Sequence, residues 1–167
     1  MSVCWFLGAQ MFPDISVIIT CYNYGKYLER CLRSIYNQDH KNRFTYEVIV
    51  VNDCSTDNTD AVIHKFLKFD NFRYISNATN RGISVSCNTA IHESNGRYIV
   101  RVDADDYVSR HFLFLLKFAL DKNRLYQAFC CDYIEVDIYE NVLRYVSPPE
   151  EQIACAVMYR KEFLLDV

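Results

Sequence analysis

The stretch RYIVRVDADD at residues 97–106 decides the expected fold, because an apolar run passes directly into a group of carboxylates. Residues 97–102 are rich in Ile and Val, which favour a buried β-strand. Asp103, Asp105 and Asp106 then place three acids within four residues. The residues from 111 to 120 have a nearly continuous apolar surface. The stretch therefore predicts a strand that ends in an acidic loop, followed by a helix.

The same order of strand, loop and helix occurs three times before residue 97. The expected elements are strand 15–20, helix 26–37, strand 47–52, an amphipathic stretch over 61–67, strand 72–76 and helix 83–93. Such regular alternation implies right-handed crossovers and a mostly parallel sheet. We therefore expect a three-layer α/β/α fold.

The pattern changes after residue 120. Residues 128–136 and 142–146 are typical of strands, and a short polar turn at Glu140 and Asn141 joins them. We expect a short antiparallel hairpin appended to the sheet at its C-terminal side.

Composition limits the class of protein. The chain has 167 residues, of which 51% are hydrophobic and 15% aromatic, so it is about one domain long and can bury an ordinary core. Its net charge of -3 gives no basic excess for phosphates along a polynucleotide. Bulk charge therefore argues against nucleic acid as a partner.

The eight cysteines show no paired C-x-x-C spacing of the kind that builds zinc or redox sites. Several lie on apolar segments, where a free Cys acts as a small hydrophobic residue. We expect reduced thiols and a cytoplasmic protein.

Residues 1–13 are expected to form an N-terminal extension, and residues 14–167 the folded domain. The apolar run at 3–12 is shorter than the roughly 20 residues of a membrane-spanning helix. It fits a packing contact or a membrane-surface contact, so peripheral association with the inner face of the membrane is an expectation.

Three polar clusters follow strands of the expected sheet. They lie at residues 20–23, 52–57 and 103–106. The carboxyl ends of parallel strands meet at one edge of a sheet, where loops form a common crevice. Ser55 to Asp57 alone would fit a solvated loop with a helix cap equally well. The convergence of three clusters predicts a binding site.

The acidic cluster predicts a divalent metal ion at this site. Neighbouring carboxylates repel one another unless a cation or a ligand with many donors lies among them, and without it at least one pKa should be raised. Oxygen ligands suit Mg²⁺ or Mn²⁺, which often share their coordination with substrate phosphates.

The motifs resemble those of the family 2 glycosyltransferases, which have the GT-A fold. The resemblance covers residues 14 to about 165. It is carried by TCYN at 20–23, VVNDCSTD at 50–57, NRG at 80–82 with Asn88, and DADD at 103–106. It implies inverting transfer of a sugar from a nucleoside diphosphate sugar, often UDP-linked, to a hydroxyl of a glycan, lipid or protein.

The resemblance also implies roles for single residues. Thr20 and Tyr22 would line the nucleoside pocket, Asp53 would accept a hydrogen bond from the base, and Asp103 would lie against the ribose. Asp105 would bind the metal. The donor-binding set that follows is Thr20, Tyr22, Asn23, Asp53, Arg81, Gly82, Asn88, Asp103 and Asp106, with Asp106 orienting the donor or its sugar.

The chain departs from the family pattern at three positions. Asn52 stands where an Asp is frequent, Cys54 where Gly is frequent, and Cys87 where Arg is frequent. The last change removes one positive contact to the donor, for which Arg81 is a candidate replacement, although Arg81 fits a solvated helix start equally well.

Inverting transfer needs a general base. The family places it in an acidic pair shortly after a segment like residues 154–164, so we expect the base beyond Val167 and a C-terminal acceptor part that is short or missing. Other acids are Asp132, Asp137, Glu150 and Glu151, and each is more easily explained as a surface carboxylate.

Two functions stay open at this point. The chain is a glycosyltransferase that needs a missing C-terminal part or a partner chain for turnover, or a non-catalytic nucleotide-sugar-binding module. A nucleotidyltransferase is disfavoured, because Gly25 is the only glycine in the loop after the first strand.

Overall fold

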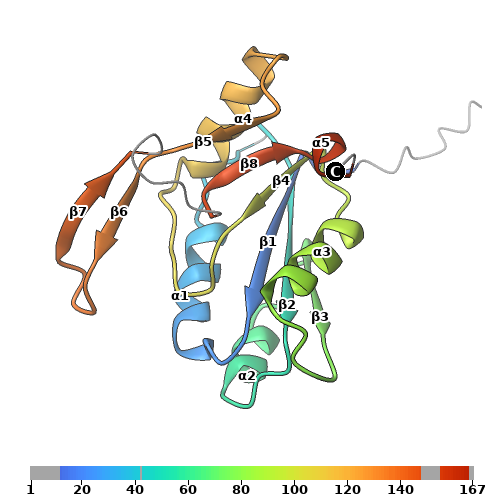
Figure 1. The fold of residues 1–167 in the computed structure, drawn as a ribbon, viewed down its shortest axis with the longest axis vertical. Helices are drawn as coiled ribbons and strands as arrows, with labels where there is room; N and C mark the ends of the chain where they lie inside the picture. The colour runs from blue at the N-terminus through green and yellow to red at the C-terminus, as the bar shows by residue number, and fades with distance from the viewer. Residues whose placement is uncertain (1–11, 42, 148–154, 166–167) are drawn as a thin grey trace, which may run out of the picture.

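The computed structural model describes residues 12–41, 43–147 and 155–165. A six-stranded sheet with the order β3-β2-β1-β4-β8-β5 forms its centre (Figure 1). The parallel strands are β1 (Ile15–Cys21), β2 (Tyr46–Asn52), β3 (Phe72–Ser76) and β4 (Tyr98–Arg101). Strand β8 (Val157–Arg160) runs antiparallel to both of its neighbours, β4 and β5 (Ala128–Cys130).

Helices cover both faces of the sheet and make three layers. The first face packs against α1 (Gly25–Tyr36), α2 (Thr59–His64) and α4 (Phe112–Lys122). The second packs against α3 (Ile83–Glu93) and α5 (Lys161–Leu165). The expected three-layer α/β/α fold with a mostly parallel sheet is confirmed.

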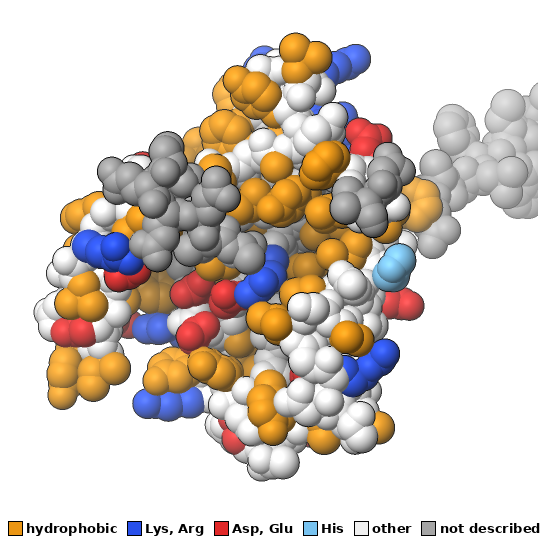
Figure 2. Space-filling model, in the orientation of Figure 1, with side chains coloured by type: hydrophobic (Ala, Val, Ile, Leu, Met, Phe, Trp, Pro, Cys, Tyr) orange, Lys and Arg blue, Asp and Glu red, His pale blue; other side chains and the backbone are white. Residues whose placement is uncertain are grey.

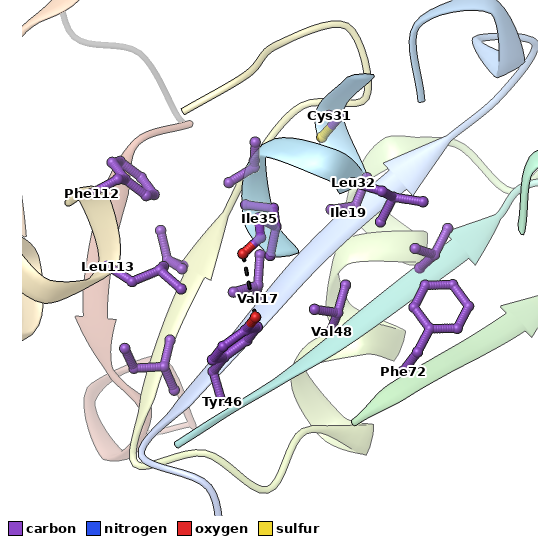
Figure 3. Packing of buried hydrophobic residues seen from close by; sticks show 14 of the residues in the cluster. Val17, Ile19, Cys31, Leu32, Ile35, Tyr46, Val48, Phe72, Phe112 and Leu113 are labelled. Carbon is purple, nitrogen blue, oxygen red and sulfur yellow. Dashed lines mark hydrogen bonds between the residues drawn. The ribbon is translucent and has the colours of Figure 1, made fainter. Parts of the chain in front are cut away.

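The alternation of side chains along β1 explains this layering. Val17 and Ile19 point into the larger cluster with Leu32 and Ile35 of α1, whereas Ile18 belongs to the smaller cluster under α3 (Figure 3). Every residue of β2 is buried, as a central strand covered on both faces requires. The hydroxyl of Tyr46 donates a hydrogen bond of 3.4 Å to the carbonyl oxygen of Ile35, which joins strand and helix (Figure 3).

Most expected elements lie within two residues of their predicted ends, and the strand at 72–76 and the helix at 83–93 match at both ends. The helix expected around 61–67 is shorter. It covers Thr59–His64 and gives way to turns, and Leu67 is exposed.

The expected antiparallel hairpin is present, but the prediction that it joins the main sheet is wrong. Strands β6 (Tyr133–Val136) and β7 (Val142–Val146) pair with each other in a separate two-stranded sheet, which stands apart at the side of the molecule (Figure 1). The stretch 128–136 is divided at residues 131–132, and only its first part, β5, joins the main sheet. Strand β8, which the sequence did not reveal, takes the place beside β4.

Several further expectations concern the chain ends and the thiols. Of the expected N-terminal extension, residues 1–11 lie outside the described residues, as do Glu150 and Glu151. Within the described part of the chain, no helix has both the length and the apolar character needed to cross a membrane. The seven cysteines in that part are free thiols.

A buried arginine fastens β8 to the rest of the domain. Arg160 is 5% exposed. Its guanidinium donates to the carbonyl oxygens of Leu120 at 2.8 Å and Asn123 at 3.3 Å, at the end of α4, and to that of Tyr126 at 2.9 Å. Carbonyls at a helix C-terminus attract a positive charge, so this end of α4 and β8 stabilise each other.

We predict that Arg160→Met destabilises the domain by about 2–4 kcal/mol, because it leaves buried carbonyl groups without donors. Arg33→Met is the matched control, since the Arg33 side chain is 72% exposed and pairs only at the surface with Glu29. Urea unfolding of both variants measures the effect. Equal stability of the two would contradict the anchoring role of Arg160.

Candidate functional site

A cleft of about 430 Å³ opens where β1, β2 and β4 end. Its lining comes from the end of β1, from four loops and from the start of α3. The residues are Thr20, Cys21, Tyr22, Tyr24, Asp53, Asn80, Gly82, Ile83, Ser86, Asp103, Ala104 and Asp105. The three polar clusters expected to converge therefore do lie around one cleft.

Six of the sequence-predicted site residues line this cleft: Thr20, Tyr22, Asp53, Gly82, Asp103 and Asp105. Four others do not belong to the lining among the described residues: Asn23, Arg81, Asn88 and Asp106. Sequence reasoning missed Tyr24 and Ile83, which are exposed at 44% and 53% and give the cleft apolar surface.

The carboxylate of Asp53 joins two walls of the cleft. Its Oδ1 accepts hydrogen bonds from Asn77 Nδ2 at 2.7 Å and from the backbone N–H of Arg81 at 2.9 Å. Its Oδ2 accepts from the backbone N–H of Gly82 at 2.8 Å. The loop after β2 is thereby tied to the loop between β3 and α3. Arg81 contributes its backbone to this contact, while its side chain lies on the surface.

The pKa of Asp53 is lowered from its ordinary value. Burial opposes ionisation and would raise the pKa, since Asp53 is 4% exposed. The N–H groups of Arg81, Asn77 and Gly82 outweigh burial, because they stabilise the charged form. The Ser86 side chain adds a further hydrogen bond that lowers the pKa, and Asp53 is therefore ionised at neutral pH.

The loops after β1 and β2 are tied together in a similar way. Asn23, with a φ of 59°, accepts a hydrogen bond at its Oδ1 from the N–H of Thr56 at 2.8 Å. Asp57 accepts from the N–H of Gly25 at 2.9 Å and from the N–H of Thr59 at 3.0 Å. One carboxylate thus accepts hydrogen bonds from the first N–H groups of both α1 and α2. This agrees with the expectation that the loop contains a helix cap.

Gly25 is required by this close approach. A Cβ at residue 25 would lie 2.5 Å from Asn58 Oδ1 and 2.6 Å from the backbone nitrogen of Thr59. Any larger residue would therefore push α1 and α2 apart, so the glycine serves packing between the loops.

The three acids of the loop after β4 have different environments. Asp103 Oδ1 pairs with Arg101, at 2.7 Å from Nε and 2.6 Å from Nη2. Asp105 is exposed at the cleft, and its carboxylate has no ion pair among the described residues. Ligand atoms of Asp103, Asp106 and Cys155 lie within 4.8 Å of one another. Figure 2 shows acidic side chains gathered near the middle of this face, with basic side chains beside them.

The expected raised pKa is found at Asp106. The residue is exposed as a whole, yet its carboxyl group is partly desolvated. This desolvation is the largest cause of the raised pKa. The charges of Asp105 and Asp103 raise it further. Burial likewise raises the pKa of the Cys155 thiol to about 12, so that thiol is neutral beside the acids.

Helix α1 holds the backbone of the acidic loop through one row of side chains. Cys31 Sγ donates to the carbonyl oxygen of Asp103 at 3.4 Å, and Arg30 Nη2 to that of Asp105 at 3.0 Å. Ser34 Oγ accepts from the N–H of Val108 at 3.1 Å. Gln38, just after the end of α1, continues the row. Its side chain donates a hydrogen bond to the carbonyl oxygen of Ser109 and accepts one from the N–H of Leu113. No pattern in the sequence indicates this role, because these residues fit an ordinary amphipathic helix.

The structure shows the surroundings of the three residues that depart from the family pattern. Asn52 donates from Nδ2 to Asp60 Oδ1 at 2.7 Å, so an Asp there would face a second carboxylate. Cys54, where Gly is frequent, has a φ of 64°, a conformation that glycine adopts without strain. Burial raises the pKa of the Cys87 thiol, and the charge of Arg101 offsets part of this rise. The structure therefore places the positive charge of Arg101, at the end of β4, near Cys87.

Residues 16–163 match the family described as glycosyl transferase family 2. Glycosyltransferase GlyA of Streptococcus pneumoniae is 35% identical over 99 residues, which cover 59% of this chain and 14% of GlyA. Poly(ribitol-phosphate) beta-N-acetylglucosaminyltransferase TarS of Staphylococcus aureus is also 35% identical over 99 residues, which cover 59% of this chain and 17% of TarS.

Solved structures agree with the fold. The crystal structure of S. aureus TarS 1-349 in complex with UDP-GlcNAc has a TM-score of 0.76 and 26% identity, and the match covers 92% of this chain and 47% of that one. Mannosyltransferase PcManGT from Pyrobaculum calidifontis, in complex with GDP-Man and Mn²⁺, has a TM-score of 0.74 at 21% identity, over 94% and 47%. The GT-A fold is confirmed, and the chain spans less than half the length of these proteins.

We predict that Asp53→Asn lowers the free energy of unfolding at pH 7 by about 2 kcal/mol, because an amide N–H₂ would face a backbone N–H donor. The folded pKa of Asp53 is lowered, so its contribution is complete above the unfolded value of about 3.9 and disappears as the pH falls through the folded value. Urea unfolding between pH 7 and pH 2.5 should show the difference from the unmodified protein shrinking in acid. The exposed Asp70→Asn is the control. A difference that stays constant over this range would contradict the role of Asp53.

Proposed function

Because the chain belongs to glycosyl transferase family 2, we propose that its cleft binds a nucleoside diphosphate sugar and that the protein transfers the sugar, with inversion, to a hydroxyl of a glycan, lipid or protein. The observation that carries the proposal is the meeting of Asp53, Asp103 and Asp105 at the ends of β2 and β4 around one cleft. An open sheet of this kind binds ligands at the carboxyl ends of its strands.

We assign the nucleoside to the part of the cleft lined by Thr20, Tyr22 and Asp53. Tyr22 and Tyr24 offer exposed ring surface for a base, and the ionised carboxylate of Asp53 is the acceptor we assign to a base N–H. UDP is the proposed nucleotide, and the TarS complexes with UDP and UDP-GlcNAc support this choice.

The sugar and diphosphate are assigned to the side of the cleft formed by the acidic loop. Arg101 fixes the orientation of Asp103, which we place against the ribose. Asp106, beside Cys155, is assigned to the donor sugar. Gly82 shapes the wall, since its φ of 81° leaves its N–H turned to Asp53. Asn23 and Arg81 act by tying loops together, and Asn88 is an exposed residue of α3 that completes the proposed donor set.

A divalent cation, Mn²⁺ or Mg²⁺, fits the residues present. Asp105 offers an exposed carboxylate at the cleft, without an ion pair among the described residues, while Asp103 is already paired with Arg101. Asp105 is therefore the proposed protein ligand. Such an ion supplies positive charge that stabilises a departing nucleoside diphosphate.

Asp137 does not suit the role of general base. Asp137 accepts hydrogen bonds from the N–H groups of Tyr139 and Asn141 and from Asn141 Nδ2, which occupy both of its oxygens in a surface turn. Its role is structural, and the proposal assigns donor binding and leaving-group stabilisation to the cleft.

We predict that Mn²⁺ strengthens UDP binding at least about tenfold in the unmodified protein, and that Asp105→Asn removes this dependence. Calorimetric titration with UDP, with and without Mn²⁺, measures both. Binding coupling is reciprocal, so UDP should strengthen Mn²⁺ binding by the same factor.

Asp70→Asn, on the exposed turn before β3, is the control that should retain the Mn²⁺ effect. Equal Mn²⁺ dependence in the unmodified protein and in Asp105→Asn would rule out the assignment of Asp105. Transfer or donor hydrolysis by the purified chain would support an enzyme, and binding without either would support the donor-binding module.

A further inference from the structure

Arg30 of α1 contacts two segments that are distant in the sequence. Its Nη2 donates to the carbonyl oxygen of Asp105 at 3.0 Å, and its Nη1 pairs with Glu140 Oε1 at 3.1 Å. The guanidinium also lies over the ring of Tyr107, 4.5 Å from its centroid. Arg30 therefore bridges the acidic loop and the turn of the β6–β7 hairpin.

On the side of the acidic loop, Arg30 is the charged member of the row of α1 side chains. Cys31 and Ser34 hold the backbone on either side of the Asp105 peptide through neutral hydrogen bonds. Hydrogen bonds from a charged donor are about twice as strong as neutral ones. Arg30 thus fixes the peptide that carries the proposed metal ligand.

On the side of the hairpin, the turn presents Glu140 in a defined position. Asp137 accepts from the N–H groups of Tyr139 at 2.8 Å and Asn141 at 2.9 Å. Glu140 has a φ of 66°, a conformation that costs a non-glycine residue free energy and persists where the surroundings impose it. A two-stranded hairpin is only marginally stable alone, so a charged contact to the body of the domain matters to its position.

The hairpin also exposes apolar side chains near this contact. Ile138 and Tyr139 are 83% and 79% exposed at its tip, and Figure 2 shows hydrophobic side chains at this side of the molecule. The hairpin is thus connected to the peptide of Asp105 through the contacts of Arg30 with Glu140 and with the Asp105 carbonyl oxygen.

We propose that Arg30 is a positioning residue for the donor site, which holds the Asp105 peptide at the cleft and couples it to the β6–β7 hairpin. The inference rests on the proposed function, because it assigns a donor-binding role to Asp105. It adds a residue and a segment, the hairpin, that lie outside the cleft lining.

The first measurement is UDP affinity in the presence of Mn²⁺ for Arg30→Met, Arg30→Lys and the control Arg33→Met. Arg30→Met should weaken binding about tenfold, because the loop that carries Asp105 loses its charged anchor. Arg30→Lys keeps the charge but not the forked geometry, so it should recover part of the loss. Arg33→Met should bind as the unmodified protein does, since Arg33 pairs with Glu29 on the surface.

The second measurement separates coupling from local stability. Amide hydrogen exchange without ligand should be faster in Arg30→Met at residues 104–108 and at residues 137–141 together, and unchanged there in Arg33→Met. Glu140→Ala should weaken UDP binding about threefold, and the double variant should lose less than the sum of the two single losses.

The outcomes distinguish failure of the donor site from failure of the positioning role of Arg30. If the unmodified protein fails to bind UDP, the proposed UDP donor site and the donor-binding role of Arg30 are both overturned. If the unmodified protein binds UDP and Arg30→Met binds equally well, with unchanged exchange in both segments, only the positioning role is overturned. Faster exchange confined to one segment would contradict the coupling.

Discussion

The structure depends first on the carboxylate of Asp53, a buried charge that no side-chain cation neutralises among the described residues. Three N–H groups, from Asn77 and from the backbone of Arg81 and Gly82, compensate it instead. A buried carboxylate without such donors would be costly. The loop between β3 and α3 must therefore close onto the end of β2, and this closure forms one wall of the cleft.

The other walls are fixed by the same means, that is by side chains that bond to the backbone of a neighbouring loop. Asn23 and Asp57 join the loops after β1 and β2, and the row of α1 side chains holds the loop after β4. Loops without regular structure are thus held at the edge of a rigid sheet. This arrangement suits a site in which carboxylates must keep their positions despite mutual repulsion.

Much of the fold and part of the site could be predicted from local patterns. Runs of β-branched and aromatic residues marked β1, β2, β3 and β4, and the acids after 102 marked the cleft, because both signals lie within a few consecutive residues. Strand β8 was missed, since its four residues are short and its partners are distant in the sequence. The hairpin was placed on the sheet because a pattern of alternation does not reveal which strand is the neighbour. Arg30 was missed because an arginine on an amphipathic helix ordinarily faces solvent.

The proposed function requires that the strand-end cleft binds a nucleotide donor and that a divalent ion assists. The most direct measurement is the binding profile of the purified protein across UDP, GDP and dTDP sugars, each with and without Mn²⁺. We expect UDP-linked donors to bind most tightly and Mn²⁺ to strengthen their binding. Absence of binding for all three nucleotides, or equal binding of all three without any effect of Mn²⁺, would contradict it.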